Sequence, residues 1–196
     1  MSMREIIHFF IIVVPLLVSG CATTTISKYQ VVGENTICNG SDLGNISVLP
    51  ETAWRSDQKE PEKRSMMALE EITKSFQMMS CGNISNSGGI KAFSKWSSRP
   101  ESELLTQFSA EGVDTLIFIR IEELTPRLNF TFSLPFLWAG SNEADFRVRV
   151  ISVATGEILN DMRIKQVTGG AFNVRPAEWS RAELSSALDK VINGSD

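Results

Sequence analysis

An apolar run near the start of the chain constrains the rest of the sequence more than any other feature. It covers residues 6–18 and is interrupted only by His8 and Pro15. Its length suits the apolar region of a secretory signal peptide, and it is too short for a helix that crosses a bilayer about 30 Å thick. Two small residues and then Cys21 follow it. We therefore expect the first segment to be removed, so that the fold is built from the remaining residues.

The end of this run, Val18-Ser19-Gly20-Cys21, resembles the lipobox of bacterial lipoproteins. The resemblance implies a signal peptide over 1–20, cleavage before Cys21 and a lipid (palmitate among its chains) on that cysteine. Ala22 follows it, where enteric bacteria use Asp to keep lipoproteins in the inner membrane, so the resemblance implies the periplasmic face of the outer membrane. The residues alone also permit a plain signal peptide or a membrane stub. A polar stretch over 21–35 is predicted to be the lipidated tether.

Removing the signal peptide has consequences for chemistry. His8 is the only histidine of the chain, so the mature protein would lack the base of a Ser-His-Asp triad or Cys-His pair and any histidine ligand for a metal. Arg4 and Glu5 leave together, so the formal net charge stays at −4. A mildly acidic chain is a poor match for nucleic acid. We predict no catalytic residues, no metal and no cofactor.

Cys38 and Cys81 are the two cysteines that remain. Outside the cytoplasm two such cysteines usually form a disulfide, and two free buried thiols are the alternative. A thiol-redox site is not expected, because no C-x-x-C spacing is present.

The periodicity of apolar residues predicts one α/β domain over 36–196. After Pro61, apolar residues recur at spacings of three and four, as in an amphipathic helix. This stripe consists of Met66, Leu69, Ile72, Phe76 and Met79. Further helices are expected over 100–112 and 176–192, and strands over 46–49, 81–84, 113–124, 145–153 and 157–167. The last two strands flank Ala154-Thr155-Gly156, a hairpin turn. We predict a single layer of mixed sheet with about three helices packed on it.

Three segments are similar to the α/β domain of the TolB amino-terminal region, the curli-secretion channel lipoprotein and lipoprotein activators of penicillin-binding proteins. They are Ile46-Ser47-Val48-Leu49-Pro50, Val113-Asp114-Thr115-Leu116-Ile117 and the residues 148–158, which contain Thr155-Gly156. The resemblance covers roughly residues 45–192. It implies no catalytic residues and an accessory role in envelope assembly or secretion through binding.

The stretch 127–140 alternates apolar and polar residues and is rich in aromatic side chains. The alternation predicts a strand, and Pro135 confines it to an edge or to its own end. It either completes the core or docks a partner or a lipid surface. The candidate contact residues are Phe130, Phe132, Phe136 and Trp138.

Charged residues suggest two weaker possibilities. The last hairpin places Arg147 and Arg149 on one face with Arg163 and Lys165, either as a basic strip for an acidic partner or headgroups or as a solvated sheet face. The pairs Glu70-Glu71 and Glu122-Glu123 are not expected to form catalytic dyads, because neighbouring side chains point apart.

These observations favour a non-enzymatic, lipid-anchored outer-membrane lipoprotein that binds an envelope protein. A self-assembling subunit of an export pore or periplasmic ring, which would be a homo-oligomer, is the alternative. An envelope hydrolase that uses carboxylates is a third hypothesis, and it requires Asp or Glu pairs that converge in a deep cleft.

Overall fold

The computed structural model describes residues 23–38, 40–86, 89–130, 138–171 and 178–194. The elements along these residues are β1 (Thr23–Val32), β2 (Asn45–Thr52), α2 (Pro61–Gln77), β3 (Asn83–Ile84), a short 3-10 helix η1 (Trp96–Ser98), α3 (Glu101–Ala110), β4 (Thr115–Phe130), β5 (Trp138–Ser152), β6 (Ile158–Ala171) and α4 (Trp179–Ile192). None of the helices in these ranges is both long and apolar enough to span a membrane.

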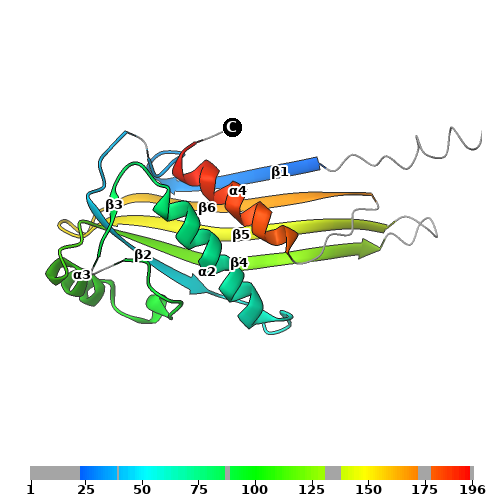
Figure 1. The fold of residues 1–196 in the computed structure, drawn as a ribbon, viewed down its shortest axis with the longest axis horizontal. Helices are drawn as coiled ribbons and strands as arrows, with labels where there is room; N and C mark the ends of the chain where they lie inside the picture. Colours follow the sequence, from blue (N-terminus) through cyan, green and yellow to red (C-terminus); the bar gives the residue numbers. More distant parts are fainter. Residues whose placement is uncertain (1–22, 39, 87–88, 131–137, 172–177, 195–196) are drawn as a thin grey trace, which may run out of the picture.

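The strands form one mixed sheet in the order β1-β6-β5-β4-β2-β3. The first four run antiparallel to one another, whereas β2 pairs in parallel with β4 and with β3. Figure 1 shows α2 and α4 side by side across one face of the sheet, with α3 at one end. The predicted α/β class, a mixed sheet with three helices, is confirmed.

Two hydrophobic cores lie on opposite faces of this sheet. The larger core packs α2 and α4 against fully buried strand residues such as Ile117 and Phe146. The smaller core packs Leu104 and Phe108 of α3 against Leu116. Because Leu116 and Ile117 are consecutive in a strand, their side chains point to opposite faces. The helix α3 therefore covers one end of the second face, and the described residues place no other α-helix there.

The residues predicted to form a polar tether differ in the structure. Residues 23–32 form strand β1, which pairs antiparallel with β6 from Thr23↔Gly169 onward. The segment is rich in Thr, Val, Ile and Tyr, which favour strands, and its polar character suits an edge strand with solvent on both faces. The tether prediction was wrong for these residues because the partner strand lies far away in the sequence.

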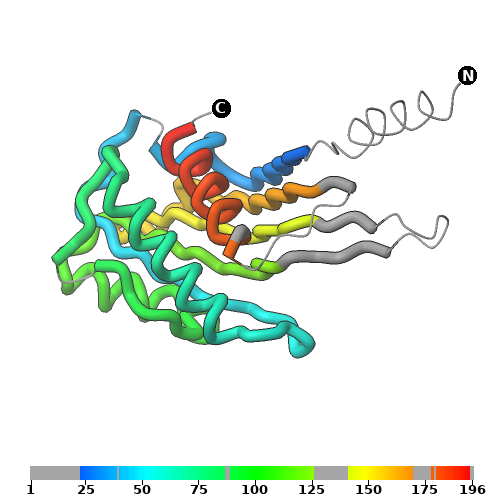
Figure 2. Tube along the Cα trace, turned by 45° about the vertical axis from the view of Figure 1, so that its right-hand side comes forward, coloured from blue at the N-terminus to red at the C-terminus, as the bar shows by residue number. Residues whose placement is uncertain are grey.

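The expected strand over 127–140 belongs to two strands. β4 continues to Phe130, and β5 begins at Trp138, where the two residues are paired across the ladder. Residues 131–137 join them and lie outside the described residues. In Figures 1 and 2, β1 begins at the end of the sheet where β4 ends and β5 begins. The other predicted hairpin, β5–β6, is present, with Gly156 at φ +71° in its turn.

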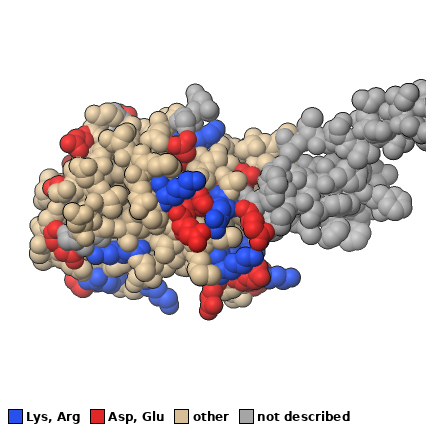
Figure 3. All heavy atoms as spheres, viewed as in Figure 1, with Lys and Arg blue, Asp and Glu red and all other residues tan. Residues whose placement is uncertain are grey.

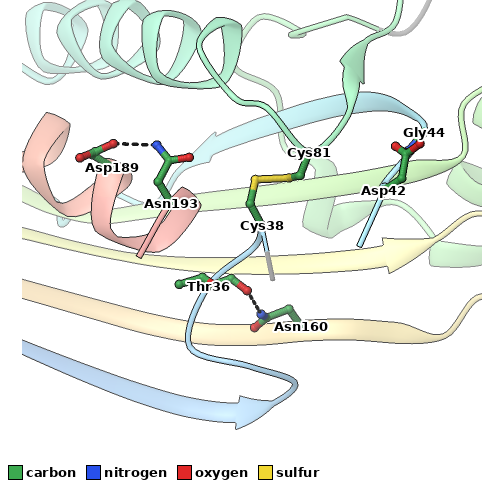
Figure 4. Close-up of a disulfide and its surroundings, with 8 residues drawn as sticks. All are labelled: Thr36, Cys38, Asp42, Gly44, Cys81, Asn160, Asp189 and Asn193. Carbon is green, nitrogen blue, oxygen red and sulfur yellow. Dashed lines mark hydrogen bonds between the residues drawn. A yellow bond between two sulfur atoms is a disulfide. The ribbon is translucent and has the colours of Figure 1, made fainter. Parts of the chain in front are cut away.

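The two remaining cysteines are paired as predicted. Cys38 and Cys81 form a disulfide with a Cα–Cα distance of 5.4 Å, which joins the segment after β1 to the segment after α2 (Figure 4). Backbone hydrogen bonds from Ile37 to Val191 and from Cys38 to Ile192, 2.8 and 3.0 Å long, attach the same segment to the end of α4. The bridge thus lies where three separate parts of the chain meet.

Candidate functional site

The second face of the sheet carries charged side chains wherever α3 does not cover it; we call this region the open face. On β5 the even-numbered Phe146 and Val148 are buried under the helices, so the odd-numbered side chains between them point to the open face. Its described members are Tyr29, Arg120, Glu122, Glu143, Asp145, Arg147, Arg149, Asp161, Arg163 and Lys165.

Ion pairs connect β5 and β6 across this face. Arg147 donates two hydrogen bonds to Asp161, at 2.7 and 2.6 Å, and the Nε of Arg149 donates a third to Asp161 at 3.2 Å. Arg163 donates two hydrogen bonds to Asp145, both at 2.9 Å. The side chain of Arg163 also lies 2.6 Å from Glu122, and Lys165 lies 2.8 Å from Glu143.

The acidic and the basic residues of these ion pairs differ in how much of the side chain is exposed. The Asp161 side chain is 4% exposed, whereas the Arg147 side chain is 42% exposed. Asp145 and Arg163 show the same contrast, at 8% and 48%. The basic residues that the sequence placed on one face are therefore part of an ion-paired ladder. In this ladder Glu143, Asp145 and Asp161 are buried, Glu122 is partly exposed, and the guanidinium groups reach solvent. A surface of this kind can offer cationic hydrogen-bond donors that are already held in place.

The acidic members were missed in the sequence because only the basic residues of the hairpin were considered. The same period-two alternation that places Arg147 on this face also places Glu143 and Asp145 there. The hairpin register adds Asp161 opposite Arg149.

The charges of the ladder shift the pKa of its members. Burial alone would raise the pKa of Asp161, but the hydrogen bonds and positive charges of Arg147 and Arg149 together hold that pKa below its usual range. The hydrogen bond with Asp161 raises the pKa of Arg147, and the hydrogen bond with Asp145 raises that of Arg163.

We expect Asp161→Asn to lower the free energy of unfolding by about 2 kcal/mol at pH 7, because it weakens charged hydrogen bonds to two arginines. A carboxyl whose pKa is lowered by folding stabilises the fold above its unfolded pKa, and this contribution is lost as the pH falls through the folded value. The difference between D161N and the wild type should therefore shrink below about pH 4. Urea unfolding from pH 3 to pH 7 measures it, and a difference that does not change with pH contradicts the assigned role.

The candidate aromatic residues lie at one end of the sheet. Phe130 and Trp138 face each other across the β4–β5 ladder, and their side chains are outside the described residues, as are Phe132 and Phe136. The predicted lipidation site, Cys21, also lies outside the described residues. Thr23, two positions after Cys21, starts β1 and pairs with Gly169, which pairs in turn with Ser141 near the start of β5. The segment after Cys21 and the aromatic connection thus leave from the same end of the sheet.

The acidic pairs singled out in the sequence form ion pairs with arginine side chains. Glu70 lies 2.6 Å and Glu71 3.6 Å from Arg181, which joins α2 to α4. In Figure 3, charges of both signs gather near the middle of the helix-covered face. Glu122 pairs with Arg163, and Glu123 lies 3.5 Å from Arg55. Within the described ranges, no group of three or more His, Cys, Asp or Glu residues is arranged to hold a metal ion.

No protein-family model and no curated protein matches the chain. Among solved structures it is similar to the PelC dodecamer from Paraburkholderia phytofirmans, with 9% identity, a TM-score of 0.46 and coverage of 85% of this chain and 97% of that one. The lipoprotein GNA1162 from Neisseria meningitidis has 12% identity and a TM-score of 0.41, with coverage of 76% and 97%. Protein XCC0632 from Xanthomonas campestris, of the domain family DUF330, has 11% identity and a TM-score of 0.41, with coverage of 84% and 91%. No statement about function follows from likenesses at this level.

Proposed function

We propose that this chain is a lipid-anchored lipoprotein at the periplasmic face of the outer membrane, and that it acts without catalysis by binding an envelope protein during assembly or secretion. The observation that supports this most is that the segment after Cys21 and the aromatic connection start from the same end of the sheet. Cys21 lies two positions before the first residue of β1, and the aromatic connection between β4 and β5 leaves from the same end. Two or more acyl chains on Cys21 would hold that end at the bilayer surface.

The same arrangement would leave the open face of the sheet and the outer surfaces of α2 and α4 accessible from the periplasm (Figure 1). Phe and Trp residues are enriched at interaction sites, and the connection between β4 and β5 leaves the end of the sheet nearest the proposed anchor. The proposed partner contact is therefore formed by Phe130, Phe132, Phe136 and Trp138, next to the anchor.

The anchor is tested by Cys21→Ser in the full chain, expressed in an enteric host. We expect the wild type to incorporate labelled palmitate and to fractionate with outer membranes, and C21S to lose the label. Ala22→Asp is the matched variant, because it should keep the label and move the protein to the inner membrane. Palmitate incorporation into C21S, or an unchanged location of A22D, would contradict the proposed anchor or the proposed membrane.

The partner contact is tested by replacing Phe132 and Trp138 together with serine and cross-linking in intact cells. We expect the double variant to lose the protein that cross-links to the wild type while it still reaches the membrane. Met66→Ser with Met78→Ser is the matched control, because these side chains, on α2 and at its C-terminal cap, are also apolar and are 62% and 65% exposed. Unchanged cross-linking in the aromatic variant, or equal loss in the control, would rule out a specific role for these residues.

One observation favours the alternative, a self-assembling subunit of an export pore or periplasmic ring. Within the described residues β1 has a neighbouring strand on one side only. An edge strand of this length presents unpaired backbone groups that can pair with a second copy. The molar mass of the full-length protein in detergent, measured by light scattering, decides the matter, and a monomer at working concentration excludes this alternative.

A further inference from the structure

A row of three arginines crosses the open face. In the strand register Arg120 of β4 is opposite Arg147 of β5, and Arg147 is opposite Arg163 of β6. Tyr29 of β1 is next in the same row. Like charges directly opposite one another on adjacent strands destabilise a sheet. A row of this kind is a cost to the fold that an anionic ligand would offset.

The three arginines differ in how their charge is neutralised. Arg147 and Arg163 are bound by Asp161 and Asp145. Arg120 is exposed and has no ion pair or side-chain hydrogen bond to any residue of the described part of the chain. Its guanidinium is therefore available to a ligand, beside two others held in fixed positions.

A cleft of about 290 Å³ lies where the open face meets the region of η1 and α3, between this region and the strands. Arg120, Arg147 and Arg149 line it from the strands, and Arg99 lines it from the opposite side. Trp96 and Phe118 add aromatic surface, and both are partly exposed. The volume is at the lower end of the range for small-molecule sites.

Two carboxylates also line the cleft, and both already have partners. Glu51 accepts hydrogen bonds from the backbone and the hydroxyl of Ser97, at 2.9 and 2.7 Å. Glu101 lies 3.6 Å from Arg149. Outside the lining, Asp161 binds Arg147 and Arg149, and Glu103 binds Arg99. Arg120 is therefore the arginine of the lining that has no carboxylate partner among the described residues.

We infer that this cleft binds an anionic saccharide, a sugar ring that bears a carboxylate or a phosphate. Guanidinium groups match both oxyanions with paired hydrogen bonds, and the aromatic side chains offer apolar surface to the ring. The inference rests on the proposed function in treating the chain as a binding protein that is anchored through Cys21 and faces the periplasm, and it adds a ligand for the open face.

The position of the row argues against a membrane headgroup as the source of the anion. Arg147 lies six positions along β5 from Ser141, which is in the same row as Gly169 and the first residue of β1. This separation is about 20 Å along the strand. It exceeds the distance of about 8 Å over which charges act at physiological ionic strength. The ligand is therefore a free or polymeric saccharide in the periplasm.

Calorimetric titration of the purified full-length protein in detergent tests the inference. We expect glucuronic acid, glucose 6-phosphate or both to bind, and glucose and inorganic phosphate to bind at least about tenfold more weakly, because each lacks one of the two recognised parts. The carboxylate and phosphate probes show which oxyanion is preferred. Arg120→Gln should weaken binding by about tenfold, and Arg120→Lys by less.

Arg181→Gln is the matched control, because it is the same change at a partly exposed arginine of α4, away from the open face. It should leave the affinity unchanged, and circular dichroism shows whether each variant is folded. The inference is overturned if neither charged sugar binds, if inorganic phosphate binds equally well, or if R120Q binds like the wild type. Binding only to phosphatidylglycerol vesicles overturns it too. The assay does not depend on where the protein is anchored, so fractionation of C21S tests the proposed function separately.

Discussion

Replacing Cys38 and Cys81 together with serine should lower the free energy of unfolding by about 4 kcal/mol. The bridge spans a sequence separation of 43 residues, and closing a loop of this length removes conformational entropy from the unfolded chain. The loop contains β2 and α2, so the reduced chain must order both elements without the constraint. Equilibrium unfolding in urea of the oxidised protein and the double variant measures the difference.

The reduced wild type is the control for this experiment. Reduction breaks the bridge without changing the sequence, so the reduced wild type and the C38S/C81S variant should have the same unfolding midpoint. The single variant Cys38→Ser should behave like the double variant under reducing conditions. A loss smaller than about 1 kcal/mol in the double variant would mean that the unfolded chain gains little freedom when the bridge is removed.

Phe76→Ala should also destabilise the protein strongly, by about 3–5 kcal/mol, because it leaves a cavity in the larger core. Phe76 is on α2 and is 1% exposed. It belongs to the core cluster that packs this helix on the sheet. Urea titration measures the loss in the free energy of unfolding. At low temperature the variant should keep the circular dichroism of an α/β protein.

Met66→Ala on the same helix is the matched control. Its side chain is 62% exposed, so truncation removes little buried surface and should change the stability by less than about 0.5 kcal/mol. Equal effects of F76A and M66A would contradict the helix orientation described above.

The same helix shows how far the sequence could predict the fold. The start at Pro61 and the spacing of Ile72 and Phe76 predicted the element and the part of its buried face that these two residues form, because these signals are local. Met66 was assigned to the buried stripe but is 62% exposed, whereas Met67, expected to widen that stripe, is buried. Apolar methionines occur on more than one side of this helix, and only packing against α4 and the sheet decides which side is covered.

The open face was predictable in part. The hairpin register follows from the alternation around Gly156, which placed Arg147 and Arg163 on one face. The row with Arg120 could not be predicted, because it depends on how β4 pairs with β5. A register irregularity between Ile121 and Glu123 displaces that ladder. The aromatic candidates Phe132 and Phe136 lie outside the described residues, so their role stays a proposal.

The pairing of β1 has a mechanical consequence. β1 starts two positions after Cys21 and is joined to β6 by nine residue pairs along its length. A pull toward the bilayer at the N-terminus would act along the strand, so all of these pairs would carry the load in shear and would not open one after another. The disulfide at Cys38 follows β1 and would stop any opening from passing beyond it to α2. So short a connection would also hold the domain in a narrow range of orientations above the membrane.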